Sequence, residues 1–249
     1  MTGSGPVRVE RDGVAFVVEP DWADAHEVAF WNAYAEGWGR DTLAAIAEFL
    51  PQGGVHLDIG AWIGIEAARA REAHGFEPDP AAYAKLRRNV ALNPALAARI
   101  RIKRAALWTR DTTLSFAVAA PGDSTTSAVL KPGEAPALEA PAFDARGPAI
   151  APLIARADFV KMDIEGAEFD LIPHIADLLA ARRPALHLSF HAHRLDKADP
   201  AAWAAKQRAC VAAIDFYPRV LAWDEGAWRD ISAERDAAYA RALSRGGLE

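Results

Sequence analysis

The 249-residue sequence contains a single cysteine and no long hydrophobic segment. Because Cys210 has no second thiol to pair with, an intrachain disulfide is excluded, which is typical of proteins from reducing compartments. Residues 1–8 lack the basic stretch and apolar core of a secretory signal. No segment reaches the roughly 18 uncharged apolar residues of a membrane span. We therefore expect a cytoplasmic protein without a membrane partner.

An excess of basic charge is also lacking. The formal net charge is −6, with acidic and basic residues intermixed along the chain. Such a protein gains nothing from the counterion release that drives nonspecific binding to DNA or RNA, so we expect no nucleic-acid partner. Hydrophobic residues make up 51% and charged residues 25% of the chain. This is the composition of a globular protein, and the length fits one domain with a terminal elaboration.

The first 52 residues predict a hairpin followed by helices. Two β-prone runs within 7–19 flank Asp12-Gly13, a pair that favours a tight turn. Residues 24–36 and 41–50 carry apolar side chains at helical spacing, and the PQGG sequence that follows Leu50 ends the second helix. We expect residues 1–52 to form an extension that covers the main domain.

From Val55 onward, short apolar runs alternate with helical segments. The expected strands cover 55–59, 73–76, 100–105, 113–118, 159–163, 185–190 and 219–223. The expected helices cover 63–72, 80–92, 167–181, 199–213 and 232–244. This alternation predicts an α/β domain over 53–249 with a Rossmann-like, doubly wound and mostly parallel sheet. Residues 119–148, rich in Pro, Gly, Ser and Thr, are expected to form an insertion on the substrate side.

The strongest chemical signal is the sequence DIGAWIG at 58–64, between an expected strand and an expected helix. Gly60 permits a sharp turn and the close approach of a ligand. The helix N-terminus beyond it suits a ligand carboxylate. In parallel α/β sheets, ligands bind beyond the carboxyl ends of the strands. This segment therefore predicts a cofactor site, with a tight turn capped by an aspartate as the alternative.

The acidic residue at the end of this strand helps to identify the cofactor. A dinucleotide site needs three glycines, whereas this loop has two. Asp58 repels a pyrophosphate but attracts the ammonium and sulfonium groups of S-adenosylmethionine. Glu77 follows the next strand nineteen positions later, close to the spacing expected for an acidic residue that binds a ribose diol. These features favour S-adenosylmethionine over NAD and oppose an NAD-dependent oxidoreductase.

Four sequence blocks carry a family resemblance: LDIGAWIG at 57–64, FEPDP at 76–80, LRRNVALN at 86–93 and KMDIEGAE at 161–168. GDSTTS at 122–127 and LSFH at 188–191 extend it. Over about 42–193 the chain resembles the FkbM-type methyltransferases, a class I group that depends on S-adenosylmethionine. The segment between Gly64 and Phe76 is shorter than expected for this group, which predicts a clipped first helix.

The resemblance implies O-methylation of a hydroxyl group on a sugar or glycan, a polyketide or another small metabolite. We expect the cofactor to contact Asp58, Gly60, Ala61, Trp62, Gly64, Glu77, Pro78, Ala105, Ala106 and Asp163. We expect the acceptor to contact Ser124, Ser127, Glu165, Glu168 and His193. Hydroxyl-rich loops are commonly solvated turns, and Glu168 could instead be a dipole partner in a first helical turn.

His191 and Asp163 are the expected catalytic residues. Methyl transfer to a hydroxyl needs a proton acceptor within hydrogen-bond reach, and a histidine titrates in the right range. We expect His191 to act as the general base and Asp163 to orient it or the substrate. We assign no metal ligands, because the donors are mixed and their spacing is no recognised metal motif. A metal-assisted variant, a noncatalytic S-adenosylmethionine-binding protein and a homodimer remain open.

Overall fold

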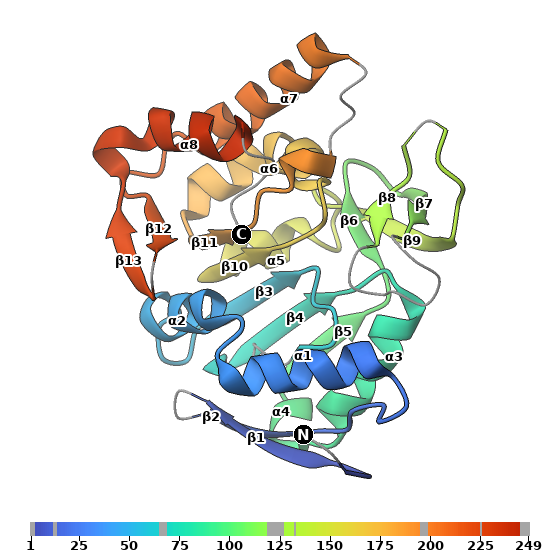
Figure 1. Ribbon diagram of the computed structural model, residues 1–249. Helices are drawn as coiled ribbons and strands as arrows, with labels where there is room; N and C mark the ends of the chain where they lie inside the picture. The colour runs from blue at the N-terminus through green and yellow to red at the C-terminus, as the bar shows by residue number, and fades with distance from the viewer. Residues whose placement is uncertain are drawn as a thin grey trace.

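A computed structural model of the protein describes residues 3–11, 14–64, 69–118, 127–131, 133–194, 199–224 and 226–244. Its centre is a five-stranded sheet in the order β11-β10-β3-β4-β5 (Figure 1). All neighbouring strands in it are parallel. The strands are β3 (Val55–Ile59), β4 (Glu72–Phe76), β5 (Ile100–Lys103), β10 (Phe159–Met162) and β11 (Ala185–Leu188). The expected Rossmann-like, mostly parallel sheet is confirmed.

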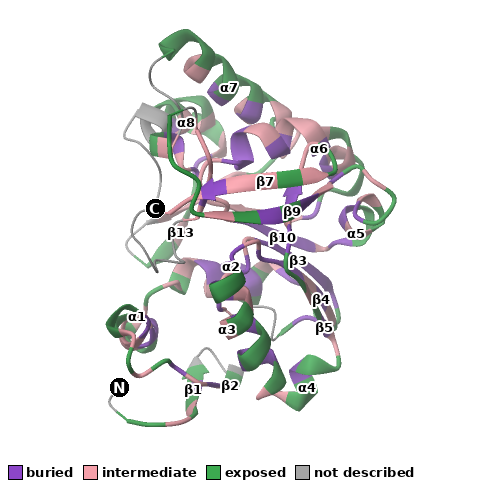
Figure 2. Ribbon diagram, turned by 90° about the vertical axis from the view of Figure 1, so that its right-hand side faces the viewer, coloured by how far each residue is buried: buried purple, intermediate pink, exposed green. Residues whose placement is uncertain are grey.

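Both faces of the sheet are covered, which gives the molecule three layers (Figure 2). Side chains alternate across a strand, so Leu57 and Ile59 of β3 face one layer while His56 and Asp58 face the other. The first layer consists of α5 (Ala151–Arg156), α6 (Glu168–Arg182) and α7 (Pro200–Ala213). The second consists of α1 (Ala25–Glu36), α2 (Arg40–Phe49), α3 (Pro80–Ala91) and the N-terminal hairpin.

The helix starts follow the local sequence. The side chains of Asp24, Asp79 and Asp199 accept hydrogen bonds from the first free N–H groups of α1, α3 and α7. Proline occupies the first turn of α3 and α7, where no N–H group is needed. The shorter helices are α4 (Pro94–Ala97), η2 (Ala192–Arg194), η3 (Ser232–Glu234) and α8 (Arg235–Ser244).

The expected N-terminal hairpin is present as β1 (Val7–Arg11) and β2 (Val14–Val18), paired antiparallel. Its expected turn pair, Asp12-Gly13, lies outside the described residues. Two asparagines bind the hairpin to the sheet domain, since the backbone N–H groups of Val17 and Glu19 donate to the side chains of Asn93 and Asn89. Apolar residues of the hairpin, α1 and α2 share one core with those of α3 and β4.

The segment after the third strand differs from the prediction. The run expected at 100–105 ends with β5 at Lys103, and the chain then enters a second sheet in the order β6-β9-β7-β8. The strands of this sheet are β6 (Ala106–Trp108), β7 (Thr112–Ala117), β8 (Ala128–Val129) and β9 (Leu138–Asp144). The expected insertion at 119–148 therefore contains the seven-residue strand β9. Its buried positions are alanines, Ala140 and Ala142, which give a weak strand signal.

Two further expectations are corrected. The helix expected at 63–72 falls partly on residues outside the described ranges, and its last residue already belongs to β4. Among the described residues of this range, Ile63, Gly64 and 70–72 are not α-helical. The strand expected at 219–223 does not join the parallel sheet. It is β12 (Leu221–Asp224), paired antiparallel with β13 (Ala227–Asp230) in a separate hairpin beside α2 (Figure 1).

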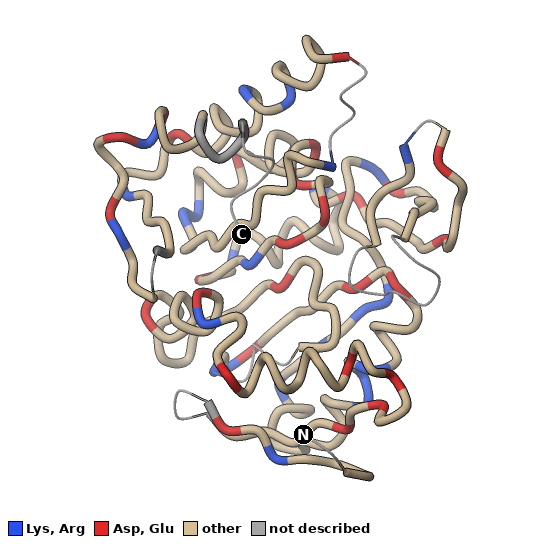
Figure 3. The backbone as a smooth tube through the Cα atoms, viewed as in Figure 1, with Lys and Arg blue, Asp and Glu red and all other residues tan. Residues whose placement is uncertain are grey.

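Charges are distributed over the whole molecule, with basic and acidic residues interspersed on most elements (Figure 3). A search of the described residues for a helix with the length and apolarity of a membrane span finds none.

We expect one added methyl group in the turn after β3 to lower the stability of the protein strongly. Gly60 has φ +84°, and a Cβ at this position would lie 1.9 Å from the carbonyl oxygen of Asp163. The substitution Gly60→Ala should therefore lower the free energy of unfolding by about 3 kcal/mol, from backbone strain and overpacking together. Gly53→Ala is the matched control, because Gly53 has φ +76° and nothing within 4 Å of the added carbon. Urea unfolding should show a loss of only about 1 kcal/mol for this control; equal losses in both variants would contradict the packing argument.

Candidate functional site

A cavity of about 1690 Å³ lies at the carboxyl ends of the central strands. Its wall includes residues that follow β3, β4, β10 and β11, together with parts of α1, α2 and the β12-β13 hairpin. This is where ligands bind in parallel α/β sheets. The volume exceeds the range of about 300–1,000 Å³ typical of small-molecule sites, so there is room for a cofactor and a second ligand.

The glycine turn after β3 forms one side of this cavity. Gly60, Ala61, Trp62 and Gly64 all line it. The N–H groups of Gly60 and Ala61 both donate to the carbonyl oxygen of Phe76, which fixes the turn to the end of β4. Trp62 adopts the left-handed conformation with φ 45°, an uncommon state for a bulky residue. The turn is therefore held in one shape by its neighbours.

Glu77 is the acidic group on the same side. Both Glu77 and Pro78 line the cavity. One oxygen of the Glu77 carboxylate accepts the N–H of Trp62 at 2.8 Å and the other accepts the N–H of Asp79 at 2.8 Å. Burial of the side chain raises the pKa of Glu77 to about 7, although these two hydrogen bonds oppose the shift. Since each carboxylate oxygen has two acceptor positions, both can still accept a ligand hydroxyl.

Asp58 lies deeper than expected. The residue is 4% exposed and is not among the described residues that line the cavity. Its Oδ1 atom is 3.4 Å from the Nζ atom of Lys161, a buried lysine on the neighbouring strand β10. Lys161 also donates to the carbonyl oxygen of Gly60 at 2.8 Å. The charge of Asp58 is therefore compensated by Lys161 instead of being directed at a ligand.

Some of the other residues expected to contact the cofactor or the acceptor line the cavity, whereas others do not. Ala106 lines the cavity, whereas Ala105 is buried and is not among the described lining residues. Ser127 lines it as well, and its hydroxyl donates to the free oxygen of the helix-capping Asp79 at 2.9 Å. Ser124 lies outside the described residues. His193 lines the cavity, with its ring centroid 5.8 Å from that of His191.

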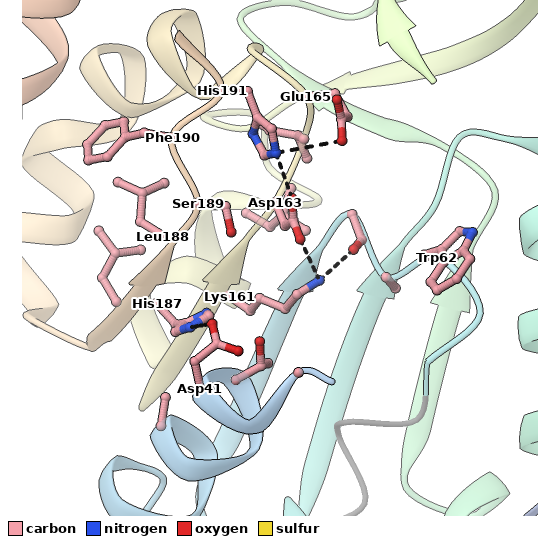
Figure 4. Close-up of a pocket in the computed structure, with 18 of the residues that line it drawn as sticks. Asp41, Trp62, Lys161, Asp163, Glu165, His187, Leu188, Ser189, Phe190 and His191 are labelled. Atoms are coloured by element: carbon pink, nitrogen blue, oxygen red, sulfur yellow. Dashed lines mark hydrogen bonds and ion pairs between the residues drawn. The ribbon is translucent and has the colours of Figure 1, made fainter. Parts of the chain in front are cut away.

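Three polar side chains meet on the opposite side of the cavity (Figure 4). The Nε2 atom of His191 lies 3.4 Å from Oδ1 of Asp163 and 3.6 Å from Oε1 of Glu165. Asp163 and Glu165 follow β10, whereas His191 follows β11, so the parallel pairing of these strands brings them together. The side chain of Asp163 is 39% exposed and lines the cavity together with the other two.

Glu168 lies beneath this cluster instead of facing a substrate. Its side chain is 0% exposed and is not among the described lining residues. The carboxylate accepts the backbone N–H of Gly166 at 2.8 Å and that of His191 at 2.6 Å, and its Oε1 atom lies 3.3 Å from Nδ1 of His191. Glu168 thus joins the loops after β10 and β11 and holds the imidazole ring from behind.

The surrounding carboxylates determine the charge of His191. Burial disfavours the imidazolium form, but Glu168, Asp163 and Glu165 outweigh it and raise the pKa of His191 to about 9. The ring therefore carries a proton at neutral pH in the free protein. This opposes the expected role of His191 as the general base, because a base must be free to accept a proton.

The sequence pattern did not identify two residues that shape the site. Lys161 falls within the KMDIEGAE block, and a lysine inside an apolar strand run is a signal that a buried partner exists. Phe30 of α1 was assigned only to a helix face, yet its ring centroid lies 4.3 Å from that of Trp62. This contact packs the N-terminal layer against the glycine turn.

Two solved structures that are similar to this chain differ widely from it in sequence. A methyltransferase FkbM from Methylobacillus flagellatus KT is 17% identical with a TM-score of 0.41, and the match covers 72% of this chain and 42% of that protein. A SAM-dependent methyltransferase from Agrobacterium tumefaciens is 13% identical with a TM-score of 0.36, and the match covers 85% of this chain and 59% of that protein. The chain thus spans less than two thirds of either protein. The comparison with curated proteins finds no match.

The sequence itself matches a family model. The model of the methyltransferase FkbM domain matches residues 58–211, which is more than half of the chain. The match begins at the glycine turn and includes Glu77, Asp163 and His191. The chain therefore belongs to the FkbM family of methyltransferases.

Proposed function

We propose that this protein transfers the methyl group of S-adenosylmethionine to a hydroxyl group of a small metabolite, a sugar or a polyketide. The observation that carries the proposal is the arrangement of one cavity. The glycine turn and Glu77 line it on one side, and Asp163 and His191 line it on the other. A methyl donor held at the first side would present its sulfonium group toward the second.

The residues of the first side fit the donor. The Glu77 carboxylate retains acceptor positions for a ribose diol, and the absence of a side chain at Gly60 keeps the turn close to the end of β10. Asp58 is paired with Lys161, so its attraction for the sulfonium is weakened. Asp163 and Glu165 supply negative charge at the opposite side of the cavity. When bound, S-adenosylmethionine supplies an electrophilic methyl carbon.

The reaction is a displacement at this carbon. The hydroxyl oxygen of the acceptor forms a bond to the methyl carbon, the carbon–sulfur bond breaks, and its electron pair remains on sulfur. The hydroxyl proton passes to the Asp163–His191 pair, where the more exposed carboxylate of Asp163 accepts it because the ring of His191 already carries a proton. Holding both reactants in line is the larger contribution, because positioning alone can supply about 7–11 kcal/mol of the barrier.

Aromatic side chains in the rest of the cavity support a ring-containing acceptor. Trp62, Trp108, Trp223 and Trp228 line the same space as Asp163. Flat aromatic faces with a polar edge suit sugars and polyketide rings, which combine apolar surface with hydroxyl groups. Ser127 adds a hydroxyl group on the expected acceptor side.

The proposal predicts that cofactor affinity depends on the ionisation of Glu77. Because burial raises the pKa of Glu77 to about 7, the carboxylate is lost as the pH falls, and a neutral carboxyl group binds a ribose diol more weakly. The Kd of S-adenosylhomocysteine, measured by calorimetry, should rise about tenfold when the pH falls from 8 to 6. Glu77→Gln should bind about 10–100-fold more weakly at pH 8 and lose this dependence. Glu139 is exposed, and the control variant Glu139→Gln should keep the pH dependence of the wild type. A wild-type Kd that is constant from pH 6 to 8 would contradict the role of Glu77 in binding the cofactor.

The proposal also predicts a separation of binding from turnover at His191. The substitution His191→Ala should lower kcat at least about 100-fold, because it removes a catalytic group and the anchor of Asp163. The Kd of S-adenosylhomocysteine should stay within about threefold, since the glycine turn and Glu77, which we propose hold the cofactor, lie on the other side of the cavity. His174→Ala is the matched control, because His174 pairs with Asp144 and is not among the described lining residues. Normal turnover by His191→Ala would exclude a catalytic role for this residue.

Activity on hydroxylated acceptors is the direct test of the enzyme assignment. A panel of sugars, polyketides and phenols should yield S-adenosylhomocysteine with at least one acceptor. A protein that binds the cofactor tightly and produces no S-adenosylhomocysteine from any of them would favour the noncatalytic alternative.

A further inference from the structure

We propose that Asp163, Glu165 and His191 form a binding site for a divalent metal ion in the wall of the cavity. The ion itself can be detected without any methyl transfer. Its role at the acceptor rests on the proposed function and deepens it.

The three side chains have the geometry of a ligand set. One oxygen of Asp163, one oxygen of Glu165 and one nitrogen of His191 all lie within 4.8 Å of one another. The two distances from Nε2 of His191 are 3.4 Å and 3.6 Å. In an octahedral site with bonds of about 2.1 Å, adjacent ligand atoms lie about 3 Å apart, so small side-chain movements complete the set.

The free oxygen atoms point to the same place. Asp163 directs Oδ2 toward the ammonium of Lys161 at 4.0 Å and Oδ1 toward His191. Glu165 accepts a hydrogen bond from Nε of Arg194 on Oε2 at 3.0 Å and directs Oε1 toward His191. Each carboxylate thus has one oxygen beside a cationic side chain and presents the other at the centre of the cluster.

A buried carboxylate lies beside the second ring nitrogen of His191. Metal-binding histidines usually donate their second ring N–H group to a carboxylate, which fixes the tautomer and directs the other nitrogen at the ion. Oε1 of Glu168 lies 3.3 Å from Nδ1 of His191 without the alignment of a hydrogen bond, so a rotation of the ring would complete this contact. This carboxylate is fully buried and held by two backbone N–H groups, so it cannot turn away to solvent.

The charge balance leaves a place for a divalent cation. Asp58, Asp163, Glu165 and Glu168 contribute four negative charges, and the described cations that contact them here are Lys161 and Arg194. In the free protein the protonated ring of His191 compensates one of the two remaining negative charges. When the ring binds a metal ion it is neutral, so both charges then need compensation in a partly buried cluster, where unpaired charge is costly. A divalent ion compensates both of them.

The donor set indicates the class of ion. Two carboxylate oxygens and one imidazole nitrogen suit Mn²⁺ and similar first-row ions better than Mg²⁺, which prefers oxygen ligands alone. Three protein ligands on one side leave positions open toward the cavity, as in catalytic sites. An acceptor hydroxyl bound there would have a lowered pKa and release its proton to solvent, in place of a transfer to the Asp163–His191 pair.

The test is a titration of the 249-residue protein with Mn²⁺, followed by electron paramagnetic resonance of the free ion, with no donor or acceptor present. One Mn²⁺ should bind per chain. Glu165→Gln and Asp163→Asn should each raise the Kd for Mn²⁺ at least tenfold, because each removes a ligand. Asp170→Asn is the matched control: it removes the same charge nearby on α6, where Asp170 pairs with Lys206 at the surface, and should leave the Kd unchanged.

Binding of S-adenosylhomocysteine by each protein shows that it is folded and separates the two proposals. Wild-type protein that binds S-adenosylhomocysteine but no Mn²⁺ would overturn the metal site and leave the proposed function intact. The metal site would also be overturned if Glu165→Gln and Asp163→Asn both bound Mn²⁺ as tightly as the wild type. Mn²⁺ binding that depends on Glu165 and Asp163, in a protein that does not bind S-adenosylhomocysteine, would support the metal site and contradict the proposed function.

Discussion

The buried ammonium group of Lys161 holds together the two sides of the site. It extends from β10, donates to the carbonyl oxygen of Gly60, and lies 3.4 Å from Asp58 and 4.0 Å from Asp163. A charge in this position is tolerated only because carboxylates and a carbonyl surround it. The glycine turn after β3 is thereby attached to the strand that carries the catalytic candidates. The turn also packs so closely on the carbonyl group of Asp163 that a methyl group at Gly60 does not fit. This packing strengthens the attachment of the turn to β10.

Acidic side chains around the cavity have different tasks because their surroundings differ. Asp58 is paired with Lys161 and stabilises the turn. Glu77 is buried beside the turn, has a raised pKa and is the residue that we propose binds the ribose. Glu168 orients His191 from behind, whereas Asp163 and Glu165 face the cavity. Strand ends, the loops that follow them and the start of α6 provide these groups, and burial decides which of them a ligand can reach.

The sequence was sufficient to predict the parallel sheet and the position of the cavity. Short, mostly apolar runs such as 55–59 and 159–162 bury both faces of a strand, and glycine and proline mark the turns between them. Since parallel strands bring their carboxyl ends to one edge, Gly60, Glu77, Asp163 and His191 were expected together. They do line one cavity.

The features that could not be predicted from the sequence depend on the register of the strands and on contacts between residues that are distant along the chain. The pairing of Lys161 with Asp58 follows from the alignment of β10 with β3, which no local pattern encodes. Glu168 reads as a residue of a first helical turn, and its complete burial depends on the loop after β11. The strand β9 was missed because it buries alanines, and the hairpin of β12 and β13 because alternation favoured a further parallel strand.

A crystal structure of the protein with S-adenosylhomocysteine bound tests the central claim most directly. The account predicts that the ribose hydroxyls donate to the carboxylate of Glu77, that the ligand lies against the turn at Gly60 and Trp62, and that its sulfur faces Asp163 and His191. A ligand bound elsewhere, or a sulfur directed away from these two residues, would contradict the account.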